Sequence, residues 1–232
     1  MTRIDERVST HVYKVKRISK EEMESIAGVC VYDQPPFCNA ACPLKLDVKA
    51  MLKAAAENDF KKAFKIYESI APFPLILSAG CGAPCEEKCR LCELGDGIAI
   101  GDIERAVALS GGAGEKRSIF RVRKKKRAAV FGSGLFALLL AGELEKKGYP
   151  VTAICGEADE EEYLRAAAGF LREDDFYTEL KRLRGKDIAF EFNAEMTKEL
   201  FEEKRGGFDV LCASEKAALD IFPDAVRDET VV

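Results

Sequence analysis

The sequence predicts a two-part chain, in which an α-helical front part is followed by an α/β part with a small parallel sheet. Seven of the nine cysteines and six of the eight prolines fall between Cys30 and Cys92. The back part instead alternates short apolar runs with helical ones. A basic run separates the two parts, so we expect domains at 1–120 and 128–232, joined by a linker at 121–127.

The front part is expected to be mostly helical. Residues 47–70 carry apolar side chains at spacings that fit two helix faces. Asn58 and Asp59 are expected to form the turn between these helices, and the two prolines within 71–74 to end the second helix. A further helix is expected over residues 99–110.

The back part is expected to hold about four strands with helices between them. The expected strands lie in residues 128–131, 151–155, 186–193 and 208–214. The expected helices span residues 135–147, 163–183 and 197–205. This alternation predicts a βαβ-type sheet.

Composition excludes several classes of protein. The chain has 232 residues, of which 47% are apolar and 33% charged, as in ordinary globular proteins. Its net charge of −4 disfavours a nucleic-acid-binding chain, and neither a membrane span nor a secretory signal is apparent, so we expect a cytoplasmic protein. An odd number of cysteines and a single histidine, His11, favour thiolate metal or redox chemistry over a disulfide framework.

The front cysteines fall into two groups along the chain. These are Cys30, Cys38 and Cys42, then Cys81, Cys85, Cys89 and Cys92. Iron–sulfur clusters take thiolates, with two or three closely spaced ligands and a distant further one. Zinc is an alternative, although the second group has helical spacing rather than paired short knuckles. Buried cysteines without a metal are a third interpretation.

A glycine turn opens the back part. Gly132, Ser133, Gly134 and Ala137 lie between an expected strand and an expected helix. This pattern is typical of the Rossmann turn that binds the pyrophosphate of a dinucleotide. The ribose-binding acid normally ends the second strand, where this chain has Cys155, and Glu157 follows two residues later. The acidic stretch 157–170 comes next, and acidic charge is unfavourable near a pyrophosphate.

Several stretches resemble a known iron–sulfur domain. PFCNAACPLKLDV, PCEEKC and IAIGDIER are similar to the N-terminal domain of the glutamate synthase small subunit and of dihydropyrimidine dehydrogenase. The segment GSGLFALLLAGELEKKGYPVTAI is similar to the flavin-binding start of the same proteins. The resemblance implies a helical domain with two [4Fe-4S] clusters and then a Rossmann-like, FAD-binding-type domain. The family's NADPH domain is expected to be missing.

The resemblance implies two ligand sets. One is Cys30, Asp33, Cys38 and Cys89, and the other is Cys42, Cys81, Cys85 and Glu104. The family has a cysteine at the position of Asp33 and a longer gap before Cys85. Cys92 is additional and is expected to compensate for one of these departures. The plain alternatives are that Asp33 is a turn residue and that Glu104 is a helix-surface carboxylate paired with Arg105 or a nearby lysine.

The resemblance also implies FAD at the turn, held by Gly132, Ser133, Gly134, Ala137 and Glu157. Cys155 and the acidic stretch disfavour it, and so does Ser214–Glu215, where the family has Thr-Gly. We therefore expect a remnant flavin domain that serves packing, with bound FAD as the alternative.

The expected function is that of an electron-transfer subunit within a larger cytoplasmic, anaerobic oxidoreductase complex. Its partners would be other redox subunits. Alternatives are a FAD-containing subunit and a structural metal-binding adaptor. A non-catalytic component is favoured over a stand-alone enzyme, although that question stays open.

Overall fold

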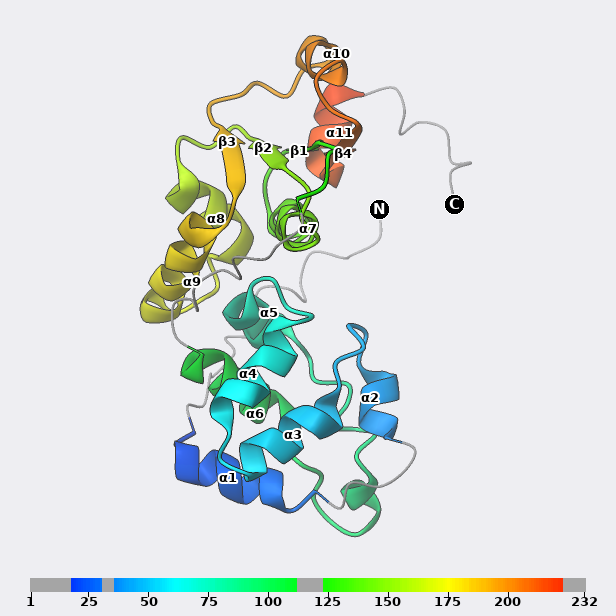
Figure 1. Cartoon of the computed structure of the whole chain (residues 1–232), viewed down its shortest axis with the longest axis vertical. Coiled ribbons are helices and arrows are strands. Elements are labelled where there is room, and N and C mark those ends of the chain that lie inside the picture. Colours follow the sequence, from blue (N-terminus) through cyan, green and yellow to red (C-terminus); the bar gives the residue numbers. More distant parts are fainter. Residues whose placement is uncertain (1–17, 31–35, 112–122, 223–232) are drawn as a thin grey trace, which may run out of the picture. The chain divides into compact units, whose positions relative to one another are not determined.

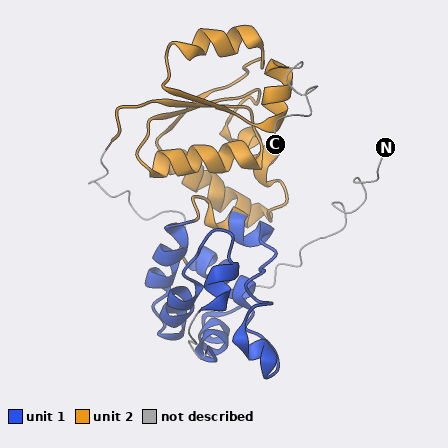
Figure 2. Cartoon of the chain, turned by 90° about the vertical axis from the view of Figure 1, so that its right-hand side faces the viewer, with its two compact units in different colours: residues 1–70, 77–110 blue, residues 71–76, 111–232 orange. Residues whose placement is uncertain are grey.

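The chain forms two compact units. A computed structural model describes residues 18–30, 36–111 and 123–222, so Asp33 and His11 lie outside the described residues. Unit 1 comprises residues 1–70 and 77–110, and unit 2 comprises residues 71–76 and 111–232 (Figure 2). A short segment in the middle of the front part, 71–76, therefore belongs to unit 2.

The described part of unit 1 is helical (Figure 1). Its elements are α1 (Lys20–Gly28), α2 (Phe37–Ala41), α3 (Val48–Ala56), α4 (Phe60–Glu68), the 3₁₀ helix η1 (Arg90–Glu93) and α6 (Ile100–Ser110). Helix α5 (Pro74–Gly80) starts within the unit 2 segment and ends in unit 1. The expected helices over 47–70 and 99–110 are confirmed by α3, α4 and α6.

Aspartate side chains cap the N-termini of α3 and α4. Asp47 accepts a hydrogen bond from the backbone N–H of the third residue of α3, and Asp59 accepts one from the backbone N–H of Lys62 in α4. Asn58 has a positive φ of 60°, a conformation that asparagine tolerates better than most residues. The predicted turn at Asn58–Asp59 is therefore confirmed, because it combines a left-handed residue with a helix cap.

The core of unit 1 is built largely from the buried faces of α1, α3, α4 and α6. Its fully buried large side chains include Met23, Leu46, Met51, Leu52, Tyr67, Ile100 and Ile103. The apolar spacing seen in residues 47–70 thus points inward, as expected from a helical period. Helices α3 and α4 pack against each other, and α6 packs against α4.

The described part of unit 2 contains a four-stranded parallel sheet, which confirms the expected strands. They are β1 (Ala128–Phe131), β2 (Val151–Ile154), β3 (Ile188–Glu191) and β4 (Val210–Ala213). Their order across the sheet is β3-β2-β1-β4, and every pairing is parallel. Because β1 lies between β2 and β4, the turn after β1 emerges near the middle of the sheet.

Helices cover both faces of this sheet. They are α7 (Leu135–Lys146), α8 (Glu160–Ala168), α9 (Glu173–Gly185), α10 (Lys198–Arg205) and α11 (Glu215–Ile221). Residues of α8 and α9 share one apolar cluster, and residues of α10 and α11 share another with Ala129 and Phe131 of β1. The helical stretch expected over 163–183 is two helices, since α8 ends at Gly169. Helix α11 was not expected from the sequence.

The segment 71–76 is buried within unit 2. Phe73 is completely buried, and a Cβ added to Gly142 of α7 would lie 2.7 Å from its ring. The backbone N–H of Leu75 donates to Glu179 Oε1 of α9 at 2.6 Å, and Arg182 Nη1 donates to the same oxygen at 3.0 Å. A buried carboxylate therefore holds the start of α5 in unit 2.

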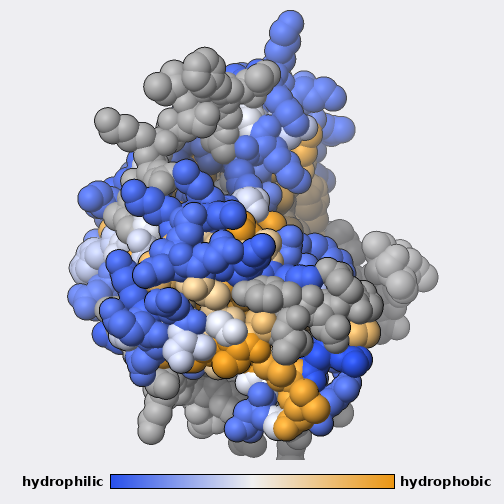
Figure 3. All heavy atoms as spheres, turned by 60° about the horizontal axis from the view of Figure 1, so that its bottom comes forward, coloured by the Kyte–Doolittle hydropathy of each residue, from blue (hydrophilic) through white to orange (hydrophobic). Residues whose placement is uncertain are grey.

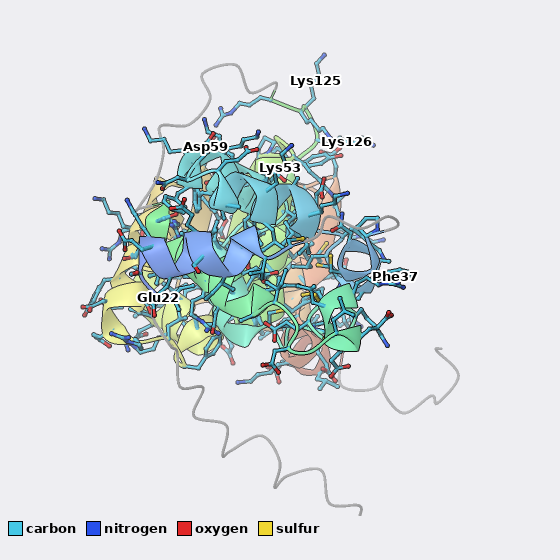
Figure 4. All side chains as sticks on the ribbon, turned by 90° about the horizontal axis from the view of Figure 1, so that it is seen from below. Glu22, Phe37, Lys53, Asp59, Lys125 and Lys126 are labelled. Carbon is cyan, nitrogen blue, oxygen red and sulfur yellow. The ribbon has the colours of Figure 1, made fainter. Side chains whose placement is uncertain are left out.

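The basic run also contacts unit 2. Arg123 pairs with Asp187, the Lys124 ammonium lies 4.1 Å from the Tyr149 ring centre, and Lys125 points away from the protein (Figure 4). Within the described residues, no helix has the length and apolar character needed to span a membrane.

Candidate metal centres

The first thiol group consists of Cys30, Cys38 and Cys89. Cys30 follows α1, Cys38 lies in α2, and Cys89 precedes η1. Burial raises the pKa of the Cys38 thiol, and the charges of Cys30 and Cys89 raise it further. Cys30 and Cys89 therefore lie within electrostatic range of Cys38. All three residues are partly exposed.

The second group consists of Cys42, Cys81, Cys85 and Glu104. Burial raises the pKa of Cys85 to about 12, and the Glu104 carboxylate and the other two thiols add to the shift. Burial likewise raises the pKa of Glu104 to about 7. Burial also raises the pKa of Cys81. Buried thiols and a buried carboxyl become anionic together only with a compensating cation, so this donor set suits an iron–sulfur cluster.

The short gap between Cys81 and Cys85 is closed by an unusual backbone. Ala83 has a positive φ of 47°, which L residues other than asparagine and aspartate seldom adopt. Its N–H donates to Cys81 Sγ at 3.4 Å. Ala83 therefore adopts a strained backbone conformation in which its N–H reaches the Cys81 sulfur.

Helix α2 serves both groups. Cys38 and Cys42 are four residues apart, and the Cys42 N–H donates to the Cys38 carbonyl at 3.1 Å. The turn after α5 likewise contains a residue of each group, Cys85 of the second and Cys89 of the first. Each of these two segments therefore holds residues of both implied ligand sets, and Cys81 gives the second segment a further thiol of the second set. That these thiols bind iron stays a prediction.

Cys92 is exposed and lies next to Gly97. Its Sγ lies 3.4 Å from the Glu86 carbonyl, and a Cβ on Gly97 would lie 2.6 Å from that sulfur. Among the charges that shift Cys38 are Cys30 and Cys89, but not Cys92. Among the described side chains, no three of Cys, His, Asp or Glu could enclose a single metal ion.

Glu104 is not the surface carboxylate of the plain alternative. It is 4% exposed and lies on the inner side of α6. Arg105 instead pairs with Asp102 at 3.2 Å, and its second amino group lies 3.4 Å from the Ser78 carbonyl. The alternative is therefore wrong about exposure, and the Glu104 carboxylate faces the second thiol group.

Sequence reasoning did not single out Glu86. Its Oε1 accepts a hydrogen bond from the N–H of Gly101 in α6 at 2.7 Å. The partner lies 15 residues away, so no local pattern predicts the contact. The one signal in the sequence is an acidic residue directly after a candidate ligand, Cys85.

The glycine turn of unit 2 is partly covered by its own chain. Gly132 has a φ of 89°, and a Cβ there would lie 2.3 Å from Ser214 Oγ and 2.7 Å from Ala217 Cβ. Gly134 has a φ of 90°, but nothing lies within 4 Å of its missing Cβ. The first glycine is thus required by α11, which packs directly onto the turn. Ser133 is partly exposed, and Ala137 is fully buried.

A buried thiol and an acidic residue lie at the end of β2. Cys155 is fully buried, and burial together with the nearby Glu157 raises its pKa to about 12. Glu157 Oε2 and the Tyr163 hydroxyl are buried without a hydrogen-bond partner among the described residues. A thiol and an acid therefore occupy the place where a ribose-binding acid would normally point outward.

Comparison with known proteins identifies the front region. Residues 7–112 match the family of dihydropyrimidine dehydrogenase domain II, 4Fe-4S cluster. The resemblance of this region to that iron–sulfur domain, shared with glutamate synthase small chains, is therefore confirmed.

Three relatives illustrate the range of similar proteins. The NADPH-Fe(3+) oxidoreductase subunit beta of Geobacter sulfurreducens is 28% identical over 119 residues, which is 50% of this chain and 17% of that protein. The glutamate synthase [NADPH] small chain of Azospirillum brasilense is 29% identical over 146 residues, covering 58% and 29% respectively. The NADP(+)-dependent formate dehydrogenase subunit beta of Moorella thermoacetica is 26% identical over 140 residues, covering 50% and 20%. The match thus spans less than a third of each relative's length.

Proposed function

We propose that this iron–sulfur domain makes the chain an electron-transfer subunit of a larger oxidoreductase, and that it holds two [4Fe-4S] clusters. The observation that carries the proposal is the pairing of the thiols into two groups by two shared segments. In each group the sulfurs are close enough for their charges to interact, although they come from distant parts of the sequence.

The first cluster would be held by Cys30, Cys38 and Cys89, with Asp33 as a fourth ligand. The second cluster would be held by Cys42, Cys81, Cys85 and Glu104. Each cluster would supply a one-electron carrier whose potential depends on ligand type, burial and hydrogen bonds to sulfur. The chain itself would keep the ligands in place, and Ala83 would donate its N–H to Cys81.

Unit 2 would support the iron–sulfur domain without binding a flavin. Ser214 and Ala217 pack over Gly132, and Cys155 is buried at the end of β2. Both observations favour a unit that binds no flavin. The strand order matches the first half of a Rossmann sheet, so the unit would be a remnant of a dinucleotide-binding domain. A flavin-binding subunit is the second candidate, because the space beside Gly134 at the start of α7 is open.

Partner subunits are part of the proposal. The relatives are named as subunits or chains of oxidoreductases. The exposed large apolar side chains in the described part of unit 1 are Val29, Phe37, Leu44 and Leu94. Each lies within two residues of a front cysteine, and Figure 3 shows apolar residues among charged ones on one face. Apolar surface of this kind favours contact with another protein.

Metal and flavin analysis tests the proposal. Protein purified and reconstituted without oxygen should hold about eight iron and eight sulfide per chain and give two EPR signals on reduction. Acid extraction should release no flavin. Fewer than about four iron per chain would contradict the cluster proposal, stoichiometric flavin would favour the second candidate, and zinc alone would indicate a structural adaptor.

A further inference from the structure

Glu86 is a charged side chain whose position the ligand sets do not explain. It lies between Cys85 of the second group and Cys89 of the first. Its Oε1 accepts the hydrogen bond from Gly101 N at 2.7 Å. Gly101 is in the first turn of α6, where backbone N–H groups have no acceptor within the helix. Glu86 therefore caps α6 from a different segment of unit 1.

The capped helix carries the candidate oxygen ligand. Glu104 comes three residues after Gly101, so it lies about one turn further along the same side of α6. Glu104 is buried, and its charge acts on both Cys81 and Cys85. Holding the first turn of α6 therefore restrains the position of Glu104 relative to these thiols.

The start of α6 packs closely on the turn that contains Glu86. A Cβ added to Gly101 would lie 3.1 Å from Ala83 Cβ and 3.3 Å from Glu86 Oε1. A contact this tight leaves little room for the helix to shift. The absence of a side chain at Gly101 thus permits the close approach of α6 to this turn, and the Glu86 carboxylate stabilises the contact by accepting a hydrogen bond.

The backbone carbonyl of Glu86 contacts Cys89 of the first group and Cys92. It accepts from the N–H of Cys89 at 3.0 Å and lies 3.4 Å from Cys92 Sγ. A change of the side chain leaves these backbone interactions in place. The two roles are separable, so a substitution at Glu86 should act on the second group alone.

We propose that Glu86 is a positioning residue for the second cluster. Its carboxylate holds the first turn of α6, and with it Glu104, against Cys81 and Cys85. Its negative charge also lowers the reduction potential of the cluster bound there, because nearby anionic charge favours the oxidised state. This inference rests on the proposed function, since it requires a cluster at that site.

Three variants test it in the full chain. Glu86→Ala removes the hydrogen bond and the charge, Glu86→Gln keeps an acceptor but removes the charge, and Glu87→Ala changes the exposed neighbour as a matched control. Glu86→Ala should lose the EPR signal of the second cluster and about half of the iron, with the first signal intact. Glu86→Gln should restore the iron and shift the midpoint potential of the second cluster upward. Glu87→Ala should match the wild type.

Hydrogen exchange gives a readout that needs no metal. In metal-free protein the Gly101 amide should exchange slowly in the wild type and in Glu86→Gln, and at least tenfold faster in Glu86→Ala. Unchanged exchange, iron and potentials in Glu86→Ala would overturn the inference, as would a Glu86→Gln variant that loses as much iron as Glu86→Ala. A wild-type chain without iron would contradict the proposed function itself, whereas two wild-type signals with an unaffected Glu86→Ala contradict only the positioning role.

Discussion

The two thiol groups differ most in their burial. Cys30, Cys38 and Cys89 of the first group are all partly exposed, whereas Cys42 and Cys85 of the second are 7% and 2% exposed. The same two segments supply both groups, so the difference does not come from the sequence spacing. Cys81, the third thiol of the second group, is partly exposed. The second group therefore has two thiols and the Glu104 carboxylate in the core of unit 1, whereas every thiol of the first group is partly exposed.

The largest effect should follow replacement of one thiol in each group. Cys85→Ser should abolish the second cluster and spare the first, whereas Cys38→Ser should do the reverse. Because Cys85 is buried, a serine hydroxyl there would also destabilise metal-free unit 1 by about 1–3 kcal/mol if it finds no partner. EPR of each reduced variant, with iron analysis and thermal unfolding of the apo form, measures both effects.

The two variants should differ in their effect on the stability of the metal-free protein. Cys38→Ser should lower the unfolding temperature of the metal-free protein less than Cys85→Ser does, since Cys38 is partly exposed. Equal loss of both EPR signals in both variants would mean that the ligand pairing is wrong or that one cluster is needed to fold the other site.

Exposure to air should separate the groups by rate. The first cluster lies where an oxidant can arrive from solvent, whereas the second is shielded by α6 and by the unit 1 core. We expect the EPR signal of the first cluster to decay several-fold faster in aerated buffer. Parallel decay of the two signals would contradict the comparison of burial. Glu87→Ala provides a surface control that should not alter either rate.

Some elements of the structure could be predicted from the sequence, whereas contacts between distant segments could not. The helix pair around Asn58, the four strands and the helix over 99–110 follow from local periodicity and turn chemistry, so they were predictable. The family resemblance implied which thiols stand together, because spacing alone allows several pairings. The contacts of Glu86 with Gly101 and of Glu179 with Leu75 join distant segments, and a single sequence carries no local signal of them.

The same limit applies to the glycine turn. Gly132 fits a dinucleotide motif in sequence, yet its neighbours in space are Ser214 and Ala217, more than 80 residues later. Helix α11 is short, and its sequence has no feature that predicts its packing on the turn. The assignment of 71–76 to unit 2 has the same origin, because the burial of Phe73 depends on α7 and α9 rather than on its own segment.

The fourth ligand of the first group can be examined through Asp33. A carboxylate in place of a thiolate changes the charge distribution and softness of the ligand set. Asp33→Cys should therefore convert the EPR signal of the first cluster to that of an all-cysteine [4Fe-4S] centre, with the second signal unchanged. An unaltered spectrum would mean that Asp33 is not a ligand and that solvent or another residue completes the site.

The smallest expected effect concerns Cys92. The experiment tests whether the Cys92 thiol takes part in the first group. A Cβ on Gly97 would lie 2.6 Å from Cys92 Sγ and 3.4 Å from Cys89 Cβ. Gly97→Ala should therefore crowd the first group, at a cost of about 1–3 kcal/mol in unit 1 stability, and weaken its cluster signal without touching the second.

Cys92→Ala removes the sulfur that Gly97→Ala would meet. If Cys92 only packs against Gly97 and the Glu86 carbonyl, Cys92→Ala alone should keep full iron, and the double variant should recover the stability that Gly97→Ala loses. If Cys92 ligates iron, Cys92→Ala should lose the first signal by itself, and the double variant should recover nothing. Because the two variants share one contact, their coupling energy reports on that contact directly. We expect recovery, since the Cys92 thiol faces the Glu86 carbonyl rather than Cys38.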